Sequence, residues 1–280
     1  MKKTIVMFAV LVLALVSMRC PKEDIVADKG SLEDLMKSDT IWFGASTKVD
    51  STSRTTILGP ETTIVWWRGA QTHDQPTLQI EVVGDSAWVS WARGNFGKLY
   101  SLAKWDTFPL VLWTKNLSER AQIRGTFFRE GSTGDDDRGW KLRSLSLAYG
   151  KSDSTNTVRV DSLRIKSSRY PDLVIKDPLN SYYRVDSLLA FKPGEAVTLT
   201  LYTNEPNGHA FLHTFILAWP FYVRVPFGNK GNGVYEGTWN AQIVVMPRWA
   251  IFDLMPHSTL YTPDKPYDFN GWLLPYQIKQ

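Results

Sequence analysis

The sequence predicts a mostly β protein of two antiparallel, sandwich-like domains with a short helix near the N-terminus. Apolar and polar residues alternate in many short blocks, which is the two-residue period of strands buried on one face. Clusters of Gly, Pro, Asn and Asp separate these blocks and supply turns. Few segments carry helix signals, and many short strands with little helix are typical of antiparallel sheets packed face to face.

The first twenty residues have the pattern of an export signal. Lys2 and Lys3 precede an uncharged, largely apolar stretch from Thr4 to Met18. A bilayer-spanning helix needs about 20 apolar residues, so this shorter run is better suited to a secretion signal. We therefore expect residues 1–20 to direct export of the chain.

Cys20 is the only cysteine in the sequence and directly follows this stretch. In that position it resembles the modified cysteine of bacterial lipoproteins, whose thiol carries a diacylglycerol and which becomes the mature N-terminus. The resemblance covers about twenty residues, and Arg19 stands where such proteins usually carry a small residue. It implies that Cys20 is the lipid attachment site of a membrane-anchored cell-envelope protein. The alternative is an ordinary signal cleaved nearby, with Cys20 removed or left free.

The charge balance gives no reason to expect nucleic-acid binding. The formal net charge is +4, but removal of Lys2, Lys3 and Arg19 with the signal lowers the 32 basic residues to 29, against 28 acidic ones. Nucleic-acid binding requires Lys and Arg clustered on one face, and the sequence shows no such cluster.

Residues 21–40 are expected to form a tether and a short helix. Ser31 can cap a helix over residues 31–37, in which three apolar residues fall on one face. The stretch from Lys22 to Gly30 is polar and lacks a periodic pattern, so it is expected to be flexible.

Residues 41–168 are predicted to form a β-rich domain. Alternating residues 78–82 and 87–91 flank Gly84-Asp85, which predicts a hairpin with a two-residue turn. The other strand-like blocks are residues 62–68, 110–114, 122–130, 140–149 and 157–165.

Residues 169–280 are predicted to form a second sandwich. Pro193-Gly194 supplies a turn, residues 197–201 alternate, and residues 211–219 are apolar on both faces, as in a fully buried strand. The stretch from Pro193 to Trp239 resembles the immunoglobulin-like modules of bacterial surface and secreted proteins, through its Pro-Gly-Glu opening and its Gly-Val-Tyr-Glu-Gly-Thr-Trp-Asn segment. That resemblance implies an immunoglobulin-like domain serving adhesion, spacing or partner binding.

Asp135, Asp136 and Asp137 form the candidate metal site. Three adjacent carboxylates repel one another unless they are solvated or share a cation, and oxygen ligands on a glycine-bounded loop suit Ca²⁺. Their spacing does not match the helix-loop-helix calcium pattern, so a solvated loop tip partly neutralised by Arg138 is favoured. No other cofactor is predicted.

The sequence assigns no catalytic residue. His209 and His213 lie on one side of any strand or helix, but Ala210 replaces the glutamate of the helical metalloprotease motif. A Gly-x-Ser-x-Gly elbow is absent from the sequence. We therefore favour the interpretation that His209 and His213 are hydrogen-bonded to protein groups beside a buried strand, and not that they are metal ligands.

Trp66 and Trp67 are the candidate ligand-binding residues. They are adjacent, so on a strand one of them must face away from the core. An exposed indole can hold a sugar ring, although burial of all twelve tryptophans in sheet cores and a domain seam is favoured.

These features predict an exported, lipid-anchored cell-envelope protein that acts as a non-enzymatic structural or partner-binding module. Its expected partners are the membrane, through the anchor, and an envelope protein or polysaccharide. The alternatives are a carbohydrate-binding surface protein that uses exposed tryptophans and, third, a hydrolase whose polar residues converge only in three dimensions.

Overall fold

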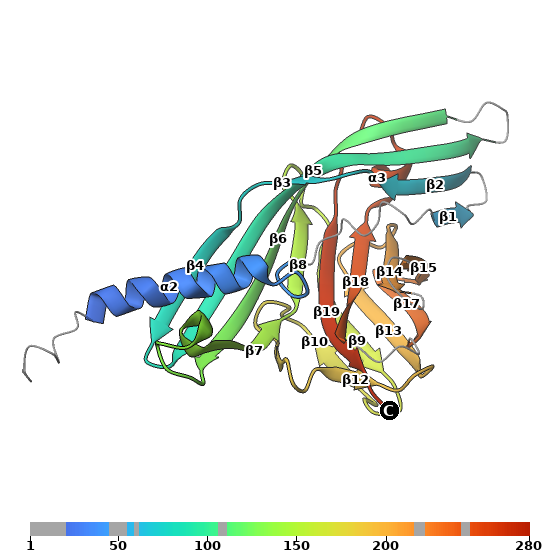
Figure 1. Ribbon diagram of the computed structural model, residues 1–280. Coiled ribbons are helices and arrows are strands. Elements are labelled where there is room, and N and C mark those ends of the chain that lie inside the picture. The colour runs from blue at the N-terminus through green and yellow to red at the C-terminus, as the bar shows by residue number, and fades with distance from the viewer. Residues whose placement is uncertain (1–20, 45–54, 59–61, 106–110, 216–221, 242–246) are drawn as a thin grey trace, which may run out of the picture.

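The computed structural model describes residues 21–44, 55–58, 62–105, 111–215, 222–241 and 247–280. Within these ranges an N-terminal helix, α2 (Pro21–Ser38), accompanies two sheets (Figure 1). The predicted fold class, mostly β with antiparallel sheets and an N-terminal helix, is confirmed. No helix in the described ranges is long and apolar enough to cross a bilayer. The predicted signal segment and Cys20 lie outside the described residues.

The larger sheet has fourteen strands and is strongly curved (Figure 1). All its strand pairs are antiparallel except β12 with β19. Its main path runs through β1 (Thr55–Leu58), β2 (Thr62–Arg68), β5 (Ser86–Trp105), β6 (Val111–Arg129), β8 (Ala148–Ser152), β19 (Asn270–Ile278), β18 (Pro247–Met255), β14 (His209–Phe215) and β15 (Tyr222–Pro226). Off this path, the sheet includes β3 (Thr72–His73), β4 (Thr77–Val83), β7 (Trp140–Ser146), β11 (Tyr182–Arg184) and β12 (Leu189–Phe191).

The longest strands, β5 and β6, form a hairpin of 20 and 19 residues. Strand β4 enters β5 through the predicted turn at Gly84 and Asp85, and the two strands pair in register from Val83 and Ser86 outward. Gly84 adopts a φ of +59°, which residues with a side chain rarely do. The hairpin predicted from the sequence is therefore confirmed.

Helix α2 (Pro21–Ser38) is longer than predicted and is already helical at Pro21, the first described residue. Residues 21–30 are helical rather than the flexible tether expected from their polar composition. Further along the helix, Leu32 and Met36 are fully buried against the large sheet and the turn that follows α2.

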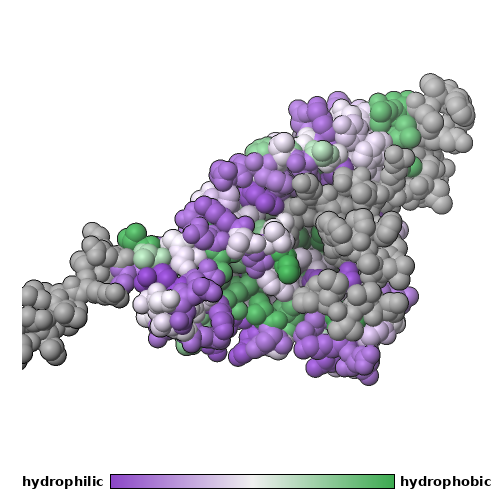
Figure 2. All heavy atoms as spheres, in the orientation of Figure 1, coloured by the Kyte–Doolittle hydropathy of each residue, from purple (hydrophilic) through white to green (hydrophobic). Residues whose placement is uncertain are grey.

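The first two turns of α2 expose apolar side chains. Ile25 is 41% and Val26 66% exposed. Figure 2 shows hydrophobic residues on the surface near the start of this helix. These side chains add nothing to the core of the protein.

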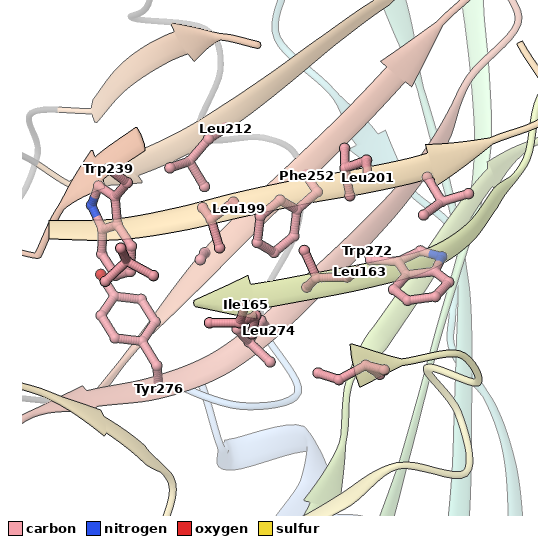
Figure 3. Close-up of a cluster of buried hydrophobic side chains, with 14 of the residues drawn as sticks. Leu163, Ile165, Leu199, Leu201, Leu212, Trp239, Phe252, Trp272, Leu274 and Tyr276 are labelled. Carbon is pink, nitrogen blue, oxygen red and sulfur yellow. The ribbon is translucent and has the colours of Figure 1, made fainter. Parts of the chain in front are cut away.

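The smaller sheet packs against part of the larger one across a shared hydrophobic core (Figure 3). Leu199 and Leu201 of the small sheet lie in this core together with Phe252 and Trp272 of the large sheet. Val197, Leu199 and Leu201 are buried as predicted, but Thr200 on the opposite face is buried as well, so this face of β13 is not the wet face expected from the alternation. The strand order is β10 (Leu173–Ile175), β9 (Val160–Lys166), β13 (Ala196–Thr203), β17 (Val234–Asn240) and β16 (Gly228–Gly231).

Both sheets contain strands from either side of residue 168. In the large sheet β8 pairs with β19, and in the small sheet β9 pairs with β13. The sandwich core is consequently assembled from residues before and after the predicted domain boundary.

Candidate functional site

A cleft of about 300 Å³ lies between the turn that follows α2 and the strands β3 and β5. Its apolar lining includes Met36, Phe43 and Trp91. Its ionisable lining includes Asp39, His73, Asp74, Arg93 and Lys37. We call it the α2–β5 cleft, and its volume lies at the lower end of the range of small-ligand sites.

One wall of the cleft is shaped by Asp39 at the end of α2. Its Oδ1 accepts hydrogen bonds from the backbone N–H groups of Ile41 (2.9 Å) and Trp42 (2.8 Å), which turns the chain sharply after the helix. The Trp249 indole N–H donates to the Ile41 carbonyl (2.9 Å), so β18 fixes this turn. At Gly44 a Cβ would lie 2.6 Å from the Thr40 carbonyl oxygen, so the turn requires glycine there.

The opposite wall is held by hydrogen bonds between β3 and β5. Asp74 Oδ1 accepts the Gly94 N–H at 2.6 Å. His73 Nδ1 lies 2.8 Å from Asn95 Oδ1, and Nδ1 is the donor because an amide oxygen can only accept. A Cβ on Gly94 would lie 2.7 Å from Asp74 Oδ2, so a larger residue would displace this carboxylate.

Arg93 lies between these walls with its guanidinium 4.8 Å from the centre of the Trp91 ring. Burial lowers the pKa of Arg93, and the nearby Asp74 carboxylate partly opposes that effect. In the described part of the chain no group hydrogen-bonds to the Arg93 side chain, and its Nε is buried without a partner.

A second group of polar residues is buried among the strands β2, β6, β14 and β18 of the large sheet. We call Arg68, Glu119, His213, Asp253 and Tyr267 the buried polar cluster, and each is at most 4% exposed. Arg68 Nη1 lies 2.6 Å from Asp253 Oδ2, and its Nη2 donates to the Tyr267 hydroxyl at 3.0 Å. The Tyr267 hydroxyl in turn donates to Glu119.

Histidine 213 belongs to this cluster and not to an open site. Its Nε2 lies 2.7 Å from Asp253 Oδ2, the geometry of a histidine paired with a carboxylate. Burial raises the pKa of Tyr267 well above its ordinary value, although the positive charge of Arg68 acts in the opposite direction. All five side chains of the cluster are buried.

His209, the other predicted histidine of β14, has different partners. Its Nε2 lies 3.4 Å from Nδ1 of His257, and its ring packs on Tyr261 of α3 (His257–Tyr261). Burial, with His257 nearby, lowers the pKa of His209 to about 4, so the side chain is neutral at pH 7. The two predicted histidines therefore do not form one site.

Trp66 and Trp67 face opposite sides of β2, as strand alternation requires. Trp66 is fully buried, with Phe211 edge-on at 5.1 Å and the Arg224 guanidinium 3.4 Å from its ring centre. Trp67 is partly exposed and stacks on Tyr100, with ring centres 5.2 Å apart. Only Trp67 of the pair therefore has surface to offer a ligand.

The acidic triplet lies in and beside a short 3-10 turn, η2 (Asp136–Gly139). Asp135 Oδ2 accepts the backbone N–H of Ser132 at 2.7 Å. Arg138, expected to neutralise the triplet, instead contacts α2. Among the described residues, no three or more His, Cys, Asp or Glu side chains are grouped to hold a metal ion.

The partner of Arg138 is Asp28, which joins α2 to the large sheet. Asp28 accepts hydrogen bonds from Arg129 Nη2 and Arg138 Nε, both at 2.7 Å, and from the Trp140 indole at 3.3 Å. Burial alone would raise the pKa of Asp28, but these three hydrogen bonds outweigh it and lower the pKa below its ordinary value. We call these four residues the α2 clamp.

No single sequence pattern indicates the α2–β5 cleft, because its residues come from three separate segments with no common motif. One signal was available in the run Arg93-Gly94-Asn95-Phe96-Gly97, since two glycines within a strand indicate a close backbone approach. In comparisons with known proteins, no family model, no curated protein and no solved structure matches this chain.

Proposed function

We propose that this chain is an exported protein of the bacterial cell envelope, anchored by a lipid on Cys20, that acts as a non-enzymatic partner-binding module. The observation that carries the proposal is the position of α2. From Pro21, the first described residue after Cys20 in the sequence, this helix continues into the folded body without a flexible segment.

The α2 clamp supports this arrangement. Asp28 is only 4% exposed and is bound by Arg129 and Trp140 of the large sheet and by Arg138 of η2. Charge-assisted hydrogen bonds of this kind are stronger than neutral ones and hold the helix in one orientation. A lipid on Cys20 would therefore attach the body to the membrane through a fixed helix, with the α2–β5 cleft at the other end of that helix.

A binding role, without chemistry, is supported by how the polar groups are used. The side chains of the buried polar cluster are each at most 4% exposed, and in the α2–β5 cleft Asp39 and Asp74 accept backbone N–H groups. The described lining of the cleft includes the Thr40 hydroxyl but no serine or cysteine, and no hydrogen bond joins Thr40 to His73.

The test is mass spectrometry of the mature N-terminus from the native host, combined with fractionation of a Cys20→Ser variant. We expect Cys20 as the first residue carrying a diacylglycerol, wild-type protein in the membrane fraction, and the variant in the soluble fraction. Ser17→Ala is the matched control, because it alters the same segment and keeps the thiol. An unmodified N-terminus at another residue, with unchanged partitioning of the Cys20→Ser variant, would contradict the proposal.

A further inference from the structure

We propose that the α2–β5 cleft binds a carboxylate group on a small apolar body, and that Arg93 is the residue that receives the carboxylate. This inference rests on the proposed function, because it names the ligand class of the binding module. Two observations support it: the Arg93 side chain has hydrogen-bond donors without an acceptor among the described residues, and apolar side chains line the cleft around it.

Arg93 is the charged group in the cleft that lacks an acceptor. Its guanidinium packs on Trp91 and makes no hydrogen bond to any described residue, and its Nε is buried. A buried donor without an acceptor costs about 1–3 kcal/mol, and more when it is charged. A ligand that supplies the acceptor removes this penalty on binding.

The other ionisable groups of the cleft already have partners. Lys37 forms an ion pair with Glu33 at 2.6 Å on the surface of α2. Asp39 accepts two backbone N–H groups, Asp74 accepts one, and His73 bonds to Asn95. A ligand anion would therefore be directed to Arg93.

The shape and charge of the cleft favour a carboxylate over phosphate. A guanidinium presents parallel N–H groups that match the two oxygens of a carboxylate. Asp39 and Asp74 also line the cleft, and their negative charges disfavour a dianion more than a monoanion. The apolar lining from Met36, Phe43 and Trp91 favours a ligand with an apolar body beside the charged group.

A carboxylate of this kind can come from a small organic acid or from the C-terminus of a partner chain. N-acetylphenylalanine represents the first source, and the peptide Gly-Gly-Phe with a free C-terminus represents the second. Binding of the peptide at least tenfold tighter than the amino acid derivative assigns the cleft to a chain terminus. Equal or weaker binding of the peptide assigns it to a small acid.

The experiment is calorimetric titration of the mature protein with N-acetylphenylalanine and with its uncharged amide. We expect saturable binding of the acid with a dissociation constant of about 1 mM or lower, and at least tenfold weaker binding of the amide. Arg93→Gln should weaken binding of the acid at least tenfold, with a smaller loss for Arg93→Lys, which keeps the charge. The control is Arg120→Gln, because Arg120 is an exposed arginine of β6 paired with Asp153 and lies outside the cleft.

Equal affinities for acid and amide, or unchanged affinity in a folded Arg93→Gln protein, would overturn the inference. The comparison of acid with amide uses the wild-type protein, so it is informative even if a variant fails to fold. If the protein does not bind the carboxylate, the mass spectrometry of the N-terminus can still show a lipid on Cys20. If the N-terminus carries no lipid but the carboxylate binds, only the proposed anchoring is overturned.

Discussion

Individual buried charges in this protein are neutralised by residues far away in the sequence. Arg68 bonds to Asp253, 185 residues later, and to Tyr267, 199 residues later. A buried ion pair that loses one member leaves the other charge without compensation, which typically costs 3–5 kcal/mol. The cluster therefore ties β2 to β18 and to the segment just before β19.

We expect Asp253→Asn to lower the free energy of unfolding by about 3–5 kcal/mol, because it removes the carboxylate that faces Arg68 and His213. Urea unfolding followed by circular dichroism measures the change. The control is Asp161→Asn, which affects an exposed pair with Arg159 and should leave the stability near that of the wild type. Equal stability of both variants would refute a structural role for the cluster.

Among the elements, α2 depends on the sheet more than its sequence indicates. Its polar first half has no periodic pattern, and the contacts that fix it come from Arg129 and Arg138, 101 and 110 residues away. A helix start set by such distant partners cannot be read from local sequence. The hairpin at Gly84, in contrast, follows from local alternation and a turn residue with positive φ, so it was predictable.

The α2 clamp should make the attachment of the helix dependent on pH. The folded pKa of Asp28 is below its ordinary value of 3.8, so its contribution is complete well above that value and is lost as pH falls through the folded pKa. We expect Asp28→Asn to lower the free energy of unfolding by about 1–3 kcal/mol at pH 7 and by progressively less below about pH 4. Urea unfolding at several pH values measures this difference, with the exposed Asp34→Asn as the control.

A destabilisation by Asp28→Asn that stays constant from pH 7 to pH 3 would contradict the clamp. Limited proteolysis gives a second measurement, because loosening of α2 should expose residues 21–38 to cleavage in the variant before the sheets are cut.

At the scale of the whole molecule, the start of α2 lies at one end of the folded body (Figure 1), and the proposed lipid anchor precedes it directly in the sequence. Val26 follows Cys20 by six residues, which corresponds to about 9 Å along a helix. The polar layer on each side of a bilayer is about 5–8 Å thick, so an anchored helix would bring Ile25 and Val26 close to it. Their exposure, 41% and 66%, suits such an environment.

We expect a fluorophore such as NBD at position 26 of the lipidated protein to be shielded from water in phospholipid vesicles. Lipid on Cys20 would consume the native thiol, so Val26→Cys provides a single reactive site. Its emission should shift to shorter wavelength and be quenched by brominated lipid. The control is Asp34→Cys, an exposed position eight residues further along α2. Identical emission from both positions would show that α2 does not contact the membrane.

The sequence predicted the class of the fold and several of its strands, but not how distant strands pair. Alternation at residues 197–201 identified the buried face of β13, and the adjacency of Trp66 and Trp67 predicted their opposite orientations. The pairing of β8 with β19 and the meeting of Asp39, Asp74 and Arg93 in one cleft depend on tertiary contacts. Periodicity carries no information about such contacts.

The position of β19 also has a consequence for the order in which the protein can fold. This strand lies between β8 and β18, and all nine of its residues are buried. A ribosome makes it after every other described strand, so the large sheet lacks an interior strand until residues 270–278 have been added. Until β19 is added, β8 and β18 each have one unpaired edge, and such edges are open to association with other strands.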